Sequence, residues 1–181
     1  MPSQAGRQLV HLRQVELTAF VRDDGLWDLE VTLADRKSRV FAGGAGDHPA
    51  GSMIHGMRLA LTVDTQGNIL GVAVDMSAVP YADSCTGAAG EYKLLVGLNL
   101  LSGFKAGLRQ RIAQRNGCSH LSELAALLPT LAIQSFADIV YPVRDNPGQL
   151  EPSSAIDGCH GLRTDGEAIR LYYPRWYKPS G

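Results

Sequence analysis

Two stretches of the chain alternate between apolar and polar residues, and this period of two constrains the fold more than any other feature. The first stretch covers residues 14–22 and 27–34, on either side of the turn signal Asp24-Gly25. The second covers residues 57–63 and 70–76, again around a polar turn. Alternation of this kind marks strands that bury one face. The pattern therefore predicts two β-hairpins in one antiparallel sheet.

Residues 91–115 change to a helical period, in which apolar residues recur every three or four positions. Interior glycines weaken this helix, because each costs about 0.5–1 kcal/mol relative to alanine. They either permit close packing on the sheet or divide the helix near Ser102-Gly103. A second helix is predicted from Ser119, as its cap, to about Ala137, with Pro129 as a point of kinking.

Strands followed by helices are typical of an α+β fold. We expect a single domain over residues 1–181, with an antiparallel sheet of about four strands in two hairpins, covered on one face by two main helices. A C-terminal extension follows, in which residues 168–173 are expected to form a last short strand. The glycine-rich segment 41–51 is expected to be an irregular surface loop.

Length and charge narrow the classes of function. A chain of 181 residues can bury a core without disulfides, and its 17 lysines and arginines nearly balance 18 aspartates and glutamates. The protein therefore has no excess of positive charge that would attract nucleic acid or an anionic membrane. The sequence has neither a signal-peptide core nor a membrane-spanning run of about 18 apolar residues. We expect a cytoplasmic protein with a small-molecule substrate, and self-association into a homo-oligomer stays open.

Three short groups concentrate the residues that can ionise or bind a metal. They hold three of the five histidines and two of the three cysteines. Cys118 and His120 fall at a predicted helix start, where free N–H groups and the helix dipole favour a thiolate and a neutral imidazole. The groups are Ile54-His55-Gly56-Met57, Gly117-Cys118-Ser119-His120-Leu121 and Ile156-Asp157-Gly158-Cys159-His160.

Four side chains near predicted strand and helix ends are candidates for proton transfer: His55, Tyr81, Asp83 and His120. Loops on a rigid sheet often present reactive groups, and His55 follows the glycine-rich segment and precedes a strand. The simpler interpretations are that His55 bonds loop backbone and that Asp83 caps a turn. A different catalytic hypothesis makes Cys118 a nucleophile activated by His55 or His160.

The cysteines and histidines also permit a zinc site. The odd, widely spaced cysteines do not suit a disulfide scaffold. Cys85, Cys118 and His120, with Cys159 or alternatively His55, supply a four-ligand set. This set lacks the tight pair two to four residues apart that structural zinc sites usually contain. We therefore expect no cofactor, with zinc as the alternative.

The same motifs carry a family resemblance. Ile54-His55-x-Met57, Gly-Cys-Ser-His-Leu at 117–121 and the closing Tyr173-Pro174-Arg175-Trp176 resemble those of a bacterial family catalogued only as a domain of unknown function. That family more often has threonine where this chain has Ser119. The resemblance implies a soluble bacterial protein, with some members associated with breakdown of aromatic compounds, including formaldehyde-losing cleavage of lignin-type dimers.

On this resemblance, the expected function is a cofactor-free lyase that acts on a hydroxylated aromatic substrate. A base would remove a phenolic or hydroxymethyl proton, and a carbon–carbon bond would break with release of formaldehyde. His55, Tyr81, Asp83 and His120 are the available proton-transfer groups. Two alternatives stay open: a zinc-binding structural or interaction module without turnover, and an enzyme that depends on Cys118.

Overall fold

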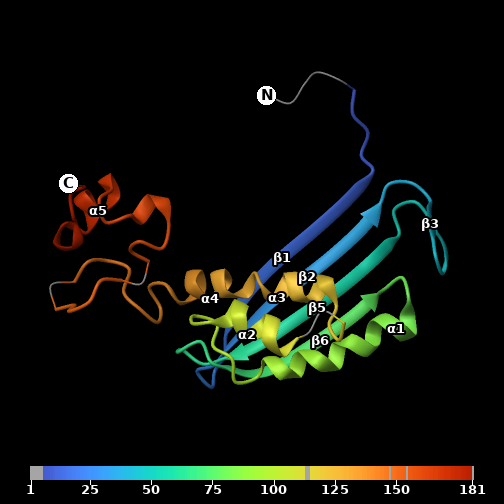
Figure 1. The fold of residues 1–181 in the computed structure, drawn as a ribbon, viewed down its shortest axis with the longest axis horizontal. Coiled ribbons are helices and arrows are strands. Elements are labelled where there is room, and N and C mark those ends of the chain that lie inside the picture. The colour runs from blue at the N-terminus through green and yellow to red at the C-terminus, as the bar shows by residue number, and fades with distance from the viewer. Residues whose placement is uncertain (1–5, 113–114, 147, 154, 181) are drawn as a thin grey trace. The chain divides into compact units, whose positions relative to one another are not determined.

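The chain folds into two compact units, one up to Ser135 and the other from Phe136 onward. The first contains a β-sheet and the helices that cover it, and the second consists of short helices and turns (Figure 1). The α+β class is therefore confirmed, while the single domain over the whole chain stays a prediction. The computed structural model describes residues 6–112, 115–146, 148–153 and 155–180.

Four long antiparallel strands form the main sheet, in the order β1-β2-β5-β6. Both predicted hairpins are present, β1 with β2 and β5 with β6. They join edge to edge, because β2 of the first hairpin pairs with β5 of the second. The strands are β1 (His11–Val21), β2 (Trp27–Lys37), β5 (Met53–Val63) and β6 (Ile69–Ala78).

The two central strands bury one face of the sheet beneath the helices. Leu29 and Val31 on β2, and Leu59 and Leu61 on β5, are 0% exposed. Burying a side chain of this size stabilises the fold by roughly 1.5–3 kcal/mol. The opposite face is polar, with an ion pair between Glu30 and Arg58, which lies diagonally across from it on β5. The alternation in the sequence thus corresponds to a core face and a solvent face.

Short helices cover the apolar face, and in Figure 1 they lie in front of the sheet. One 3₁₀ helix, η1, packs on β6, and α3 packs on both central strands. Within the described ranges, no helix has the length and apolar character needed to cross a lipid bilayer. The helices are α1 (Ala82–Thr86), η1 (Gly87–Leu95), α2 (Phe104–Arg111), α3 (Ser119–Ala125) and α4 (Leu128–Phe136).

Both long helices predicted from the sequence are divided. Gly97 and Gly103 have φ angles of 81° and 66°, in the left-handed region that glycine tolerates best, so η1 ends before them and α2 begins after them. The second prediction separates into α3 and α4. Pro129 lies in the first turn of α4, where a missing N–H costs little. Ser119 is not the cap of α3, because Cys118 occupies the N-cap position.

The expectation of an irregular loop over residues 41–51 is wrong for part of it. Strands β3 (Phe41–Gly43) and β4 (Gly46–His48) form a small antiparallel hairpin. Gly46, with φ of 128°, allows the tight reversal. The rings at the outer ends of the hairpin, Phe41 and His48, stack with centroids 5.8 Å apart. Cross-strand stacking therefore orders a segment whose composition favours a loop.

The predicted last strand over residues 168–173 is also wrong, because this segment is a helix. A strand needs a partner for its backbone groups, whereas a helix satisfies them locally. Ile169 is fully buried, and Arg170 forms a salt bridge with Glu167 one turn earlier. The second unit contains η2 (His160–Leu162), α5 (Glu167–Tyr172) and η3 (Pro174–Trp176).

The closing motif of the chain holds the second unit together. The hydroxyl of Tyr173 donates to the carbonyl of Val143 at 2.7 Å. Arg175 donates to the carbonyl of Gln149 at 2.8 Å and lies 5.2 Å from the ring centroid of Trp176. Val143 and Gln149, in the segment before these helices, are thereby tied to them.

The core assignment makes a direct prediction about stability. Replacing Leu59, which is 0% exposed, with alanine should lower the free energy of unfolding by about 2–5 kcal/mol, because a cavity forms at the centre of the sheet. Leu70→Ala on β6 is the matched control: Leu70 is 51% exposed, and the change should stay within about 0.5 kcal/mol. Urea unfolding measures both. Equal losses would contradict the assignment of the core face.

Candidate functional site

Three charged or ionisable side chains line up across neighbouring strands at one end of the sheet. The register pairs Arg13 of β1 with Asp35 of β2, and Asp35 with His55 of β5. Directly opposite residues in antiparallel strands lie on the same face with adjacent Cβ atoms. Asp35 continues the inward series of β2 and is 1% exposed, the one buried charged residue in the described part of the chain. The row therefore borders the core.

Asp35 is held by hydrogen bonds to both carboxylate oxygens. Arg13 donates from Nε to Oδ1 and from Nη2 to Oδ2, each at 2.8 Å, in the forked geometry typical of strong arginine–carboxylate pairs. Nε2 of His11 lies 3.2 Å from Oδ1. The bound guanidinium of Arg13 lowers the pKa of Asp35 to about 2, despite the opposing effect of burial. Asp35 is therefore an anion at neutral pH and an acceptor.

This acceptor fixes the orientation of His55. Nδ1 of the imidazole lies 3.1 Å from Oδ2 of Asp35. Since the carboxylate only accepts, Nδ1 carries the proton and Nε2 of a neutral ring keeps its lone pair. Burial and the charge of His120 lower the pKa of His55 below its usual value, and Asp35 partly offsets them. The neutral ring is therefore favoured, in the tautomer that a general base requires.

His120 approaches this ring from the helical layer. It lies in the first turn of α3, and its ring centroid is 4.1 Å from that of His55, at an interplanar angle of 36°. Nδ1 of His120 is 3.9 Å from Sγ of Cys118. Two of the candidate proton-transfer groups, His55 and His120, therefore lie side by side, and Cys118 lies beside the pair.

A buried tyrosine fixes the start of α3. The hydroxyl of Tyr92 donates to the carbonyl of Cys118 at 2.7 Å and accepts from its N–H at 3.2 Å. The same hydroxyl lies 2.7 Å from Oγ of Ser122, and Tyr92 is 0% exposed. Tyr92 therefore fixes the position of the first turn of α3, which carries His120.

The other predicted site residues lie apart from this arrangement. Tyr81 is 50% exposed, and a Cβ added at Gly44 would lie 2.8 Å from its hydroxyl, so the phenol sits against the β3–β4 turn. Asp83 is exposed on α1. Among the described residues, no hydrogen bond joins either group to His55 or His120. Their catalytic roles stay predictions.

The cysteines of the predicted zinc set are free thiols at different places in the fold. Cys85 is half-buried on α1, Cys118 is half-buried before α3, and Cys159 is exposed in the second unit. The group of described residues whose ligand atoms lie close together is a different one. Asp35, His55 and His120 have such atoms within 4.8 Å of one another, and this group contains no cysteine.

The sequence reasoning missed Asp35, Arg13, His11 and Tyr92. The sequence did contain one signal for Asp35. Every second residue of this strand faces the core, and Asp35 is the next such position after Leu33. A carboxylate at such a position must be paired, because an isolated buried charge is costly. Arg13 follows from the strand register, which the sequence does not display.

Comparison with known sequences identifies the family but no activity. A family profile described as a protein of unknown function, DUF2889, matches residues 11–134. The chain belongs to the DUF2889 family. No curated protein and no solved structure gives a significant match. The DUF2889 match includes Asp35, His55 and His120, while Tyr173–Trp176 lie beyond it.

Titration of His55 tests the electrostatics of this DUF2889 site. Its pKa should lie below the ordinary value of about 6.5. Asp35→Asn should lower it further, because the carboxylate favours the imidazolium, and His120→Ala should raise it by removing a neighbouring charge. NMR of the imidazole protons measures both shifts, and the signal of exposed His160 is the control. A rise in Asp35→Asn would contradict the arrangement.

Proposed function

We propose that this protein is an acid–base enzyme, and specifically a lyase that releases formaldehyde from a hydroxylated aromatic substrate of the lignin-dimer type. The observation that carries the acid–base part is the hydrogen bond of 3.1 Å between buried Asp35 and Nδ1 of His55. The substrate class comes from the family resemblance of the motifs around His55 and His120.

The surroundings of His55 support its role as the general base. Its side chain is 19% exposed, so the ring is mostly shielded but still reachable. Asp35 orients the ring and would stabilise the imidazolium that forms when Nε2 accepts a proton. Arg13 keeps Asp35 ionised throughout, so Asp35 assists without exchanging a proton. Positioned acid–base groups of this kind typically contribute about 10²–10⁴-fold to a rate.

The proposed reaction is redox neutral and balances without a cofactor. Nε2 of His55 takes the proton of a hydroxymethyl group, and the oxygen's electron pair forms the carbonyl bond of formaldehyde. The pair from the broken carbon–carbon bond forms a double bond to the adjacent carbon and expels the oxygen that this carbon carries, a phenolate in a phenylcoumaran or a hydroxyl in a diarylpropane. The leaving oxygen recovers the proton from an imidazolium, which gives a phenol or water.

His120 is suited to the second proton transfer. Its ring is close enough to His55 that a positive charge on one ring disfavours a positive charge on the other. Protonation of His55 therefore promotes loss of a proton from the pair to the leaving group. In this scheme, His55 begins the reaction and the histidine pair completes it.

Turnover of model dimers tests the proposal. Wild-type protein should release formaldehyde from phenylcoumaran or diarylpropane dimers, and His55→Ala should reduce the rate at least about 100-fold, because the base is lost. His160→Ala, an exposed histidine in the second unit, is the matched control and should keep full activity. Circular dichroism establishes that each variant is folded.

Two outcomes would count against the scheme. No formaldehyde from any member of a dimer panel would remove the lyase assignment. Full activity in a folded His55→Ala variant would remove His55 from the mechanism, even if the substrate class were right.

A second candidate is metal binding, which the grouping of Asp35, His55 and His120 favours. Two imidazoles and a carboxylate are a donor set for divalent iron, manganese and zinc. Because Arg13 already occupies both oxygens of Asp35, the better fit uses the imidazoles as ligands, with Asp35 orienting His55 from the outer shell. Such an ion would act as a Lewis acid at the same place.

Elemental analysis of protein purified without added metal tests this candidate. Near one equivalent of metal should be lost in His120→Ala and retained in Cys118→Ser, because the sulfur lies outside the group. Loss in Cys118→Ser, together with loss of folded structure, would instead support the cysteine-rich zinc set. Metal-free, folded and active protein would exclude both.

A further inference from the structure

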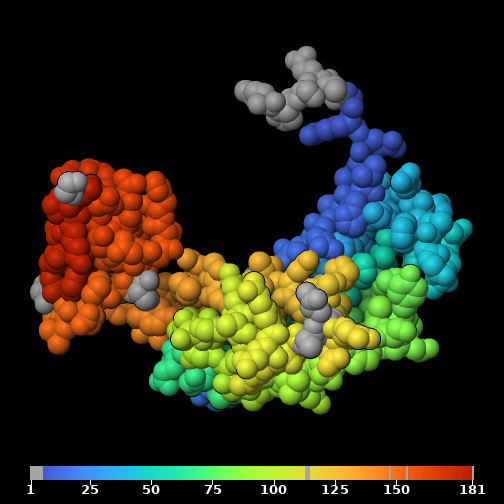
Figure 2. Space-filling view, viewed as in Figure 1, coloured from blue at the N-terminus to red at the C-terminus, as the bar shows by residue number. Residues whose placement is uncertain are grey.

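A groove of about 830 Å³ runs between α2 and α3. Figure 2 shows these two helices next to each other on one face of the molecule. Leu108 and Ile112 supply an apolar lining from the α2 side, and Ala126 from the end of α3. A small organic molecule with a flat apolar part fits such a lining, since ligand pockets are mostly apolar with few polar groups.

Two residues connect this groove to the histidine pair. Cys118 lines the groove, and its sulfur is 3.9 Å from Nδ1 of His120. Glu123 also lines the groove, and its carboxylate lies 3.4 Å from Nη1 of Arg13, the arginine that holds Asp35. A ligand in the groove therefore contacts residues that adjoin the site on two sides.

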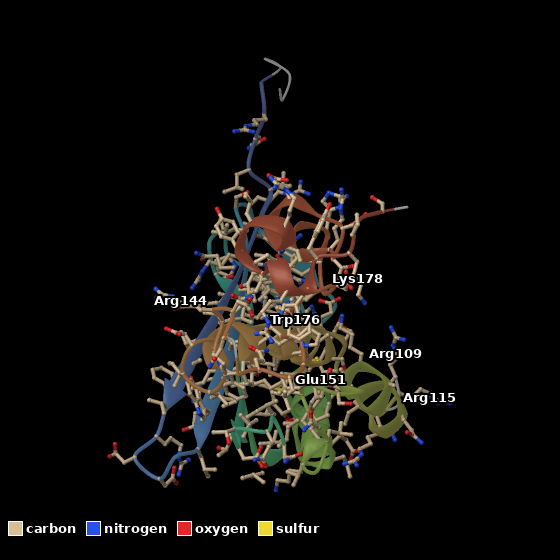
Figure 3. All side chains as sticks on the ribbon, turned by 90° about the vertical axis from the view of Figure 1, so that its left-hand side faces the viewer. Arg109, Arg115, Arg144, Glu151, Trp176 and Lys178 are labelled. Atoms are coloured by element: carbon tan, nitrogen blue, oxygen red, sulfur yellow. The ribbon has the colours of Figure 1, made fainter. Side chains whose placement is uncertain are left out.

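The α2 wall of the groove carries two positive side chains that no described residue neutralises. Lys105 and Arg109 both line the groove and are exposed, one helical turn apart. Neither forms an ion pair or side-chain hydrogen bond with any residue that the structure describes. In contrast, Arg111 on the same helix donates to the carbonyls of Leu94 and Val96. Figure 3 shows Arg109 extending outward from α2.

We propose that this groove recognises an aromatic carboxylate, so that the substrate is an aromatic acid rather than a neutral phenol or alcohol. The ring would lie on Leu108 and Ile112, and the carboxylate would meet Lys105 and Arg109. Glu123 on the facing side offsets only part of this attraction, because its one negative charge faces the two positive charges of Lys105 and Arg109. This inference rests on the proposed function, because the groove reaches the histidine pair through Cys118, and it adds the charge of the substrate.

Calorimetric binding of a matched pair of ligands tests the inference. Ferulate and coniferyl alcohol share one ring and differ in carboxylate against hydroxymethyl. Ferulate should bind at least about 10-fold more tightly at low salt, because hydrogen bonds to charged groups are among the stronger ones. Raising the salt concentration should weaken the binding of ferulate but not that of coniferyl alcohol. Inorganic phosphate should not displace it, because phosphate gains nothing from the apolar lining.

Variants separate the groove from general surface charge. In the double variant Lys105→Gln with Arg109→Gln, ferulate and coniferyl alcohol should bind with equal affinity. Arg115→Gln is the matched control, because Arg115 is an exposed arginine outside the groove lining. Equal binding of acid and alcohol by wild-type protein, no binding of either, or the same loss in Arg115→Gln would overturn the inference.

A further variant distinguishes this inference from the proposed reaction. His55→Ala should still bind ferulate with wild-type affinity while losing formaldehyde release. Binding of ferulate without turnover of any dimer would leave the groove assignment in place and remove the lyase. Turnover of neutral dimers at rates equal to those of their carboxylated analogues would remove the groove assignment and leave the lyase.

Discussion

The forked bond between Arg13 and Asp35 is the interaction on which the rest of the site depends. Asp35 is the carboxylate that ends the apolar series of a central strand, and it is 1% exposed. Removing Arg13 would destabilise the fold, because the buried charge of Asp35 would lose its main compensation. With the pair intact, Asp35 stays ionised and the proton of His55 stays on Nδ1. The free lone pair on Nε2 follows from that one contact.

The strands could be predicted from the sequence because their signal is local. Each inward residue of β2 and β5 is apolar or paired. The alternation can therefore be recognised in the sequence before the fold is known. The helices were harder, since their ends depend on backbone conformation at single residues. Gly97 and Gly103 adopt left-handed conformations that end one element and begin the next, and composition alone does not tell which glycines will do so.

The candidate site was predictable only in part, for a related reason. His55 and His120 stand at the ends of elements, and that position drew attention to both. Arg13 and Asp35 lie inside strands, where charged residues usually face solvent, and only the register reveals that they meet. Tyr92 had no local signal, because its hydroxyl acts on a turn 26 residues further along the chain. Cys85 and Cys159 had the chemistry of ligands but lie outside the close group.

The attachment of α3 has a consequence for how the site assembles. Arg13, Asp35 and His55 belong to one hydrogen-bonded sheet, whereas His120 stands on a seven-residue helix that packs on it and whose start Tyr92 holds. Helices this short have little stability of their own and open locally more easily than central strands. An opened α3 leaves the Asp35–His55 bond formed but removes its partner imidazole. The histidine pair is therefore complete only while this single helix is docked on the sheet.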